Sequence, residues 1–234
     1  METRYVANVR HVLEVTLLGT ADLAYWQRYL GDERLVPQDS NGQAELMITA
    51  ASMKFMGVAF SEISLCVLVT DAATATPGAF LLQAFNSSRA FAWCERVLFS
   101  TPYQHARCSV STGTPISIEL RQAGRVLFHA RMGTPRPPNR TGEEGWAGRV
   151  YLPSRRGDGK GDGRYFMAKL HGATRAYPFI PTDDVCTIDA PENQPAWCAL
   201  TASGFCAREW VVRDDATHAK SKTGRAEGSR CSRP

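Results

Sequence analysis

Long uncharged apolar segments are missing from this sequence of 234 residues. No run approaches the ~18 consecutive apolar residues that a membrane-spanning helix needs, so we expect no membrane segment. The first residues, Met-Glu-Thr-Arg-Tyr, are not followed by an apolar run with a small-residue cleavage site, and this absence predicts a cytoplasmic protein. With 44% hydrophobic and 21% charged residues, the composition is that of a globular protein with a buried core.

Cysteine and histidine spacings typical of metal sites are also missing. The seven cysteines include no Cys-x-x-Cys pair, and their odd number and wide scatter predict reduced thiols rather than a disulfide framework. The five histidines show no ligand spacing either. We therefore expect no metal site and no other cofactor.

Excess positive charge is absent from most of the chain. The net charge of +4 arises after His218, where five basic residues and one acidic residue follow. A nucleic-acid-binding face would spread its positive charge over folded surface, so we expect no nucleic-acid partner. The distribution predicts a single domain over residues 1–222 and a basic tail over residues 223–234.

A glycine-rich stretch, Arg-Arg-Gly-Asp-Gly-Lys-Gly-Asp-Gly-Arg over residues 155–164, fails two motif tests. A phosphate-binding loop requires Ser or Thr after Lys160, where this chain has Gly161. A calcium loop requires a bidentate Glu at its twelfth position, where Lys169 stands. The stretch is interpreted instead as part of a mobile loop, rich in Gly, Pro and charge, over about residues 133–164, in which residues 147–152 are a candidate strand.

The apolar pattern predicts a fold that is mainly β. Strands are expected over the apolar stretches 45–50, 58–70 and 79–85, and several shorter ones follow. Two helices are expected, over residues 20–30 and from about residue 87 to residue 99. Many short strands with about two helices indicate an α+β fold built on a closed, mostly antiparallel sheet rather than on βαβ units.

Between Gly42 and Val110 the order of segments is distinctive. A strand Glu-Leu-Met-Ile-Thr from residue 45 precedes the long strand that begins Phe-Ser-Glu-Ile-Ser at residue 60. The strand Gly-Ala-Phe-Leu-Leu-Gln-Ala-Phe-Asn from residue 78 then leads into a helix and Thr-Pro-Tyr-Gln-His. This order, with the closing segment Asp-Ala-Thr-His-Ala-Lys-Ser-Lys-Thr from residue 215, resembles the acetoacetate decarboxylase-like superfamily.

The resemblance implies a double-layered β-barrel or cone around a small apolar pocket, usually in a homo-oligomer. It also implies a catalytic lysine, just after the Pro that ends the central helix, which forms an imine with a keto acid. In this chain Tyr103 and Gln104 stand at the positions of that lysine and its cationic neighbour. Tyrosine forms no imine, so the decarboxylase chemistry does not carry over to this sequence.

Glu62 matches the acidic residue that points into the family's pocket from the long strand. A carboxyl group in an apolar cavity has a raised pKa and serves as acid, base or hydrogen-bond donor. Tyr103 and His105 are further catalytic candidates, on one face of the strand after Pro102. Gln104 and Arg89 are candidates for substrate binding, although strand alternation points Gln104 away from that face.

Each candidate also has a structural interpretation. The structural alternative for Glu62 is an ion pair with Arg89 or Arg107, and that for Tyr103 is a packing role with a satisfied hydroxyl. The alternative for His105 is that of an ordinary strand residue.

A lysine elsewhere in the chain would restore imine chemistry. The candidates are Lys169, in a predicted strand, and Lys222, in the closing segment.

Two main functions follow from these residues. The first is an enzyme of lyase or hydrolase type, acting on a small organic acid or carbonyl compound through Glu62 with Tyr103 or His105. The second is a non-catalytic protein that keeps the pocket for a small organic acid or apolar ligand. A third is a structural subunit whose pocket is filled by its own side chains.

Overall fold

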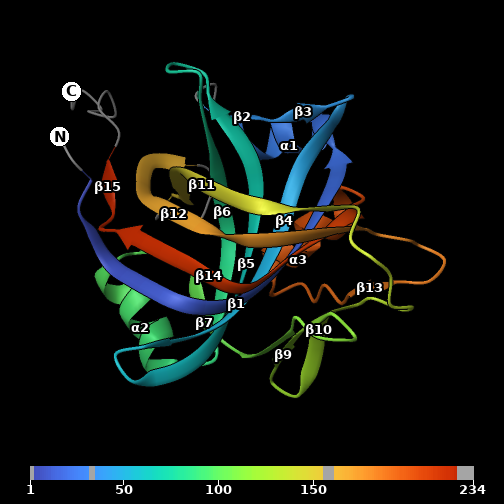
Figure 1. Cartoon of the computed structure of the whole chain (residues 1–234). Coiled ribbons are helices and arrows are strands. Elements are labelled where there is room, and N and C mark those ends of the chain that lie inside the picture. Colours follow the sequence, from blue (N-terminus) through green and yellow to red (C-terminus); the bar gives the residue numbers. More distant parts are fainter. Residues whose placement is uncertain (1–2, 32–34, 155–160, 226–234) are drawn as a thin grey trace, which may run out of the picture.

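The computed structural model describes residues 3–31, 35–154 and 161–225, and strands dominate these ranges (Figure 1). The strands are β1 (Tyr5–Asp22), β2 (Leu35–Pro37), β3 (Asp39–Ser40), β4 (Gln43–Phe55), β5 (Val58–Asp71), β6 (Thr76–Asn86), β7 (Tyr103–His105), β8 (Arg107–Ser111), β9 (Ser117–Gln122), β10 (Arg125–Arg131), β11 (Arg140–Pro153), β12 (Gly161–Pro178), β13 (Val185–Ile188), β14 (Cys206–Ser221) and β15 (Gly224–Arg225). The helices in these ranges are α1 (Leu23–Leu30), α2 (Arg89–Leu98) and α3 (Pro195–Ala202). None of them is long and apolar enough to cross a bilayer.

The large sheet closes on itself through its strand pairings. Its order β5-β4-β1-β14-β12-β11-β6 returns to β5, because β5 and β6 also pair, so seven strands form a ring. Most of the described pairs are antiparallel, as predicted. Two described pairings are parallel, those of β6 with β11 and with β7.

The sheet is buried on both faces, which explains the long apolar run of β5. Along β5, residues 63, 65, 67 and 69 pack in the main core, which also holds the small sheet β13-β10-β9-β8 and helix α3. Cys66 points to the opposite face, into a second apolar cluster with Leu68 packed against it. Strands buried on both faces read as continuous rather than alternating hydrophobic segments.

Helix α2 begins where short polar side chains replace its missing hydrogen bonds. The helix was expected from about residue 87, and its N-cap is Ser88, whose side chain accepts from the Phe91 amide. Asn86 supports this turn by accepting from the Ser88 amide at 2.8 Å. Helix α1 lies within the predicted segment 20–30, with Asp22 as its N-cap.

The segment 133–164 was predicted as a loop with one candidate strand at residues 147–152, and the observed strands take up more of it than this. Strand β11 fills residues 140–153 and pairs antiparallel with β12 over most of its length. Tertiary pairing therefore overrides the glycine and proline content of this stretch. Residues 155–160 of the glycine-rich stretch lie outside the described residues. The predicted basic tail also lies outside them from residue 226 on. Its residues Gly224–Arg225 form β15 and pair with β12.

Candidate functional site

Strand pairing brings Glu62 and Tyr103 to the same face of the large sheet. On β6, Asn86 pairs with Glu62 of β5, and Ala84 pairs both with Ser64 of β5 and with Tyr103 of β7. Paired residues of neighbouring strands point to the same face. Tyr103 belongs to the apolar cluster of that face, together with Cys66, Leu81 and Phe166.

The carboxyl group of Glu62 is half-buried and accepts two hydrogen bonds. The Tyr103 hydroxyl donates to its Oε1 at 2.8 Å, and Asn86 Nδ2 donates to its Oε2 at 3.3 Å. Burial and the negative charge of Glu95 raise the pKa of Glu62, against opposing effects of Lys220, the Tyr103 hydrogen bond and His218. A carboxyl group in this state can give or take a proton.

Tyr103 combines the packing role and the polar role that the sequence left open. Its side chain is 6% exposed within the apolar cluster, and its hydroxyl is satisfied by Glu62. Burial and the neighbouring carboxylates of Glu62 and Glu95 hold the pKa of Tyr103 well above its usual value. The phenol therefore remains a hydrogen-bond donor at neutral pH.

Lys220 of β14 is the lysine that reaches this site. Its ammonium group donates to Glu95 of α2, and both side chains are largely buried, with exposed fractions of 17% and 19%. It also lies over the rings of Phe166, Tyr103 and Phe99, at 4.4, 5.3 and 5.5 Å from their centroids. These contacts are those of an ammonium group, because ring faces and carboxylates attract positive charge.

The sequence did not single out Lys220, Glu95 or Asn86. Lys169 and Lys222, which it did single out, are exposed. Strand alternation places Lys220 and Lys222 on one face of β14, but this strand ends at Ser221. A pattern-based argument had no means of showing that Lys220 lies beside Tyr103, because their contact depends on the closure of the ring.

The remaining predicted residues lie away from Glu62. Gln104 accepts from Gln122 at 2.9 Å and from Gln194 at 3.3 Å, so it points to another network, as the strand alternation predicted. The side chains of His105 and Arg89 are exposed. Among the described residues Glu62 forms no ion pair with Arg89 or Arg107.

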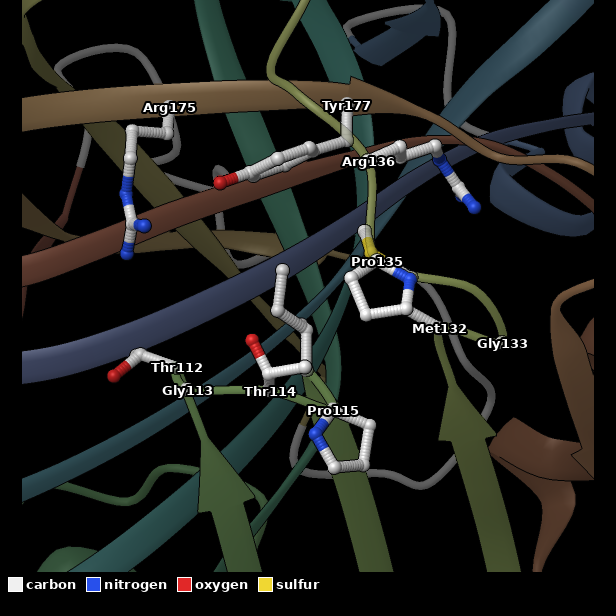
Figure 2. Close-up of a pocket in the computed structure, with 11 residues that line it drawn as sticks. Thr112, Gly113, Thr114, Pro115, Met132, Gly133, Pro135, Arg136, Arg175 and Tyr177 are labelled. Atoms are coloured by element: carbon white, nitrogen blue, oxygen red, sulfur yellow. The ribbon is translucent and has the colours of Figure 1, made fainter.

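A separate small cavity of about 50 Å³ lies where the 112–116 turn approaches the segment 132–136 and strand β12 (Figure 2). Arg175 and Tyr177 of β12 contribute to its wall. None of the predicted site residues lines this cavity. In the described ranges, no cluster of three His, Cys, Asp or Glu side chains is arranged to hold a metal ion.

The fold is that of the acetoacetate decarboxylase-like proteins. A solved acetoacetate decarboxylase has a TM-score of 0.65 and 12% identity, covering 94% of this chain and 88% of its own. The enduracididine biosynthesis enzyme MppR, with HEPES bound, has a TM-score of 0.62 and 12% identity, and the match covers 99% of this chain and 90% of MppR. The acetoacetate decarboxylase of Legionella pneumophila has a TM-score of 0.61 and 12% identity, and the match covers 96% of this chain and 89% of its own. No family model and no curated protein matches the sequence.

Proposed function

We propose that this chain is an enzyme that moves protons on a small organic acid or carbonyl compound, bound at the face of the sheet that carries Glu62. The observation that carries the proposal is the half-buried Glu62 carboxyl with a raised pKa, which is hydrogen-bonded to Tyr103 and has no cation bonded directly to it among the residues that the structure describes. Titratable groups in such surroundings are typical of sites for acid–base chemistry. The closed seven-strand ring supports a barrel interior as the binding space.

The charge pattern of the site suits an oxygen-rich substrate. Lys220, which lies over the Tyr103 ring, and Glu62 in its protonated form can donate hydrogen bonds to a carbonyl or carboxylate oxygen. Removal of a proton from the carbon next to a carbonyl leaves an electron pair on that oxygen, which such donors stabilise. This is the first step of many lyase reactions, and it requires no imine.

The solved relatives in fold support a small substrate without fixing it. MppR has been solved with pyruvate and with the condensation product of pyruvate and imidazole 4-carboxaldehyde. We take pyruvate as the first probe for this reason, together with 2-oxobutanoate, levulinate and acetone. These compounds share a carbonyl group with exchangeable neighbouring protons.

The test is exchange of carbon-bound protons for deuterium, followed by proton NMR in D₂O. We expect wild-type protein to exchange at least one of the four probes, and Glu62→Gln to be slower by about 10²–10⁴-fold, the usual contribution of acid–base catalysis. Glu192→Gln, at an exposed site, is the matched control and should retain the wild-type rate. Exchange by Glu62→Gln at the wild-type rate contradicts the proposal.

Two other results lead to different functions. Line broadening of a probe without exchange, lost in Glu62→Gln, would indicate the non-catalytic ligand-binding protein. Cyanoborohydride added to the same mixtures traps any imine, and a single stoichiometric adduct on Lys220 would show an imine route at a relocated lysine. We expect no such adduct, because imine formation needs a neutral amine and Lys220 makes the contacts of an ammonium group.

We also propose that the chain is a cytoplasmic homo-oligomer. The six cysteines of the described ranges are free thiols, which is typical of a reducing compartment.

Helix α2 carries the exposed apolar side chains of Trp93, Val97 and Leu98, and the neighbouring β4–β5 turn carries Met56 and Val58. A cluster of exposed apolar side chains of this kind favours association with a second copy.

A further inference from the structure

A second group of charged side chains lies on the same face of the sheet as Glu62. Glu62 pairs with Ala51 of β4, Ala51 pairs with Glu14 of β1, and Glu14 pairs with Arg213 of β14. Because paired residues point to the same face, this row continues directly from Glu62 across four strands. His218 belongs to the group, since its ring nitrogen Nε2 is 2.6 Å from Glu14 Oε2.

Glu14 is fully buried but remains ionised. Burial opposes its charge, but hydrogen bonds and positive charge from His218 and Arg213 outweigh this effect and lower the pKa of Glu14. Arg213 donates to Oε1 at 2.5 Å, and the Thr16 hydroxyl donates to the same oxygen at 3.4 Å. Oε1 of Glu14 therefore accepts from Arg213 and Thr16, and Oε2 is the oxygen next to His218.

This arrangement fixes the tautomer of His218. An ionised carboxylate only accepts hydrogen bonds, so Nε2 must carry the proton that Glu14 receives. In the neutral imidazole the lone pair then resides on Nδ1, which has no hydrogen-bond partner in the part of the chain that the structure describes. The side chain is 26% exposed, so this nitrogen is not sealed in the core.

His218 also lies near the rest of the site. It precedes Lys220 by two positions on β14, and strand alternation puts both side chains on one face. Lys220 contacts Glu95 and the ring of Tyr103. When His218 is protonated, its charge lowers the pKa of Glu62.

We propose that His218, held by Glu14, is the catalytic base of the site. The inference rests on the proposed function and deepens it by assigning the two proton-transfer roles. His218 Nδ1 takes the proton from the carbon next to the carbonyl as that C–H bond breaks. The electron pair forms the new C=C bond, and the carbonyl oxygen receives the proton of protonated Glu62. The products are an enol, an imidazolium stabilised by Glu14, and the Glu62 carboxylate, so charge is conserved.

The first test is His218→Gln in the deuterium-exchange assay. The glutamine amide can still donate to Glu14, but it has no ring nitrogen to accept a proton. We expect exchange to fall by about 100-fold or more. A second variant, His218→Ala, should regain exchange when imidazole is added, and this rescue distinguishes a lost base from a damaged fold.

The surface pair of His171 and Glu143 provides the matched control. Its ring nitrogen lies 3.8 Å from the carboxylate, but both side chains are exposed, at 56% and 63%. His171→Gln should exchange at the wild-type rate.

The outcomes separate the two proposals. If wild-type protein exchanges a probe, Glu62→Gln loses this exchange and His218→Gln retains it within about threefold, only the role of His218 is overturned. If His218→Gln is slow but imidazole does not rescue His218→Ala, the base assignment is likewise overturned. If wild-type protein exchanges none of the four probes, the proposed function fails, and the role of His218 fails with it.

Discussion

Glu62 and Glu14 lie in one row of the sheet, yet their surroundings act on them in opposite directions. Glu14 has Arg213 and His218 at hydrogen-bond distance, and these partners lower its pKa. Within the described ranges, the donors at that distance from Glu62 are the neutral side chains of Tyr103 and Asn86, so burial and Glu95 raise its pKa. Such opposed environments are the means by which proteins assign acid and base roles to the same residue type. They also have consequences for stability.

Glu62→Gln should therefore stabilise the protein at alkaline pH while abolishing exchange. Because the folded state raises the pKa of Glu62 above its ordinary 4.5, folded protein loses stability as pH rises from about that value through the folded pKa. Glutamine does not ionise, so the variant does not lose this part of its free energy of unfolding as pH rises. At pH 8 we expect a gain of roughly 0.5–2 kcal/mol, typical when a strained functional group is replaced.

Urea unfolding at pH 8 and at pH 4 measures this effect. The advantage of Glu62→Gln over wild type should shrink at pH 4, where both side chains are neutral, and the exposed Glu192→Gln should show no such difference. A variant that is less stable than wild type at pH 8 would mean that Glu62 is ionised and stabilised in the folded protein.

Only part of the site could be predicted from single residues. Glu62 and Tyr103 were identified through their positions in the resemblance, and the structure brings them within hydrogen-bond distance. Lys220, Glu95, Glu14 and His218 were not identified. Their contacts join residues 125 and 204 positions apart, and no local periodicity reports pairings of that range.

At the scale of elements, local patterns were sufficient where one signal dominated. The apolar run of β5 was predicted as a strand, and the turn at Ala123 and Gly124, with φ of 49° and 83°, has the positive φ at both positions that is typical of a tight hairpin. Helix α3 was missed, and of β11 only residues 147–152 were a strand candidate. The glycines of β11 are typical of a loop, so the sequence pattern did not indicate the whole strand. Helix α3 is short and apolar and has no side-chain cap hydrogen bond, so its sequence shows little helical periodicity.

The contact that closes the ring is short and gives an element-scale prediction. Strands β6 and β11 pair in parallel through Gly78, Ala79 and Phe80 opposite residues 149–151. A Cβ atom on Gly78 would lie 2.6 Å from the carbonyl oxygen of Arg149 and 2.9 Å from the Tyr151 ring. Gly78→Ala must therefore push the two strands apart, at a cost of about 1–3 kcal/mol.

Urea unfolding should show this loss, and amide hydrogen exchange should accelerate in β6 and β11. Gly142→Ala is the matched control, because it lies on β11 and a Cβ there would meet nothing within 4 Å. Equal stability of Gly78→Ala and wild type would contradict a tight closure between β6 and β11.

Helix α2 lies beside the β4–β5 hairpin at one end of the molecule (Figure 1), and both carry exposed apolar side chains. Phe91 of α2 packs on Phe60 and Phe55 of the hairpin, with ring centroids 4.8 and 6.3 Å apart. The outer side chains of Trp93 and Leu98 remain 53% and 65% exposed. A helix that is amphipathic usually buries its apolar side, so this end is the surface at which we expect copies to associate.

Light scattering coupled to size-exclusion chromatography tests this expectation. Wild-type protein should have a multiple of the single-chain mass of 25.7 kDa, and the double variant Trp93→Lys with Leu98→Glu should fall toward that mass, because charge at the centre of an apolar interface is costly. Val185→Lys, on β13 and 43% exposed, places a charge far from α2 and should leave the mass unchanged (Figure 1). If the wild-type protein has the single-chain mass at micromolar concentration, or if the double variant keeps the wild-type mass, α2 does not form the interface. Exchange activity measured on the same fractions would then show whether the site, which each chain builds from its own β5, β7 and β14, works without a neighbour.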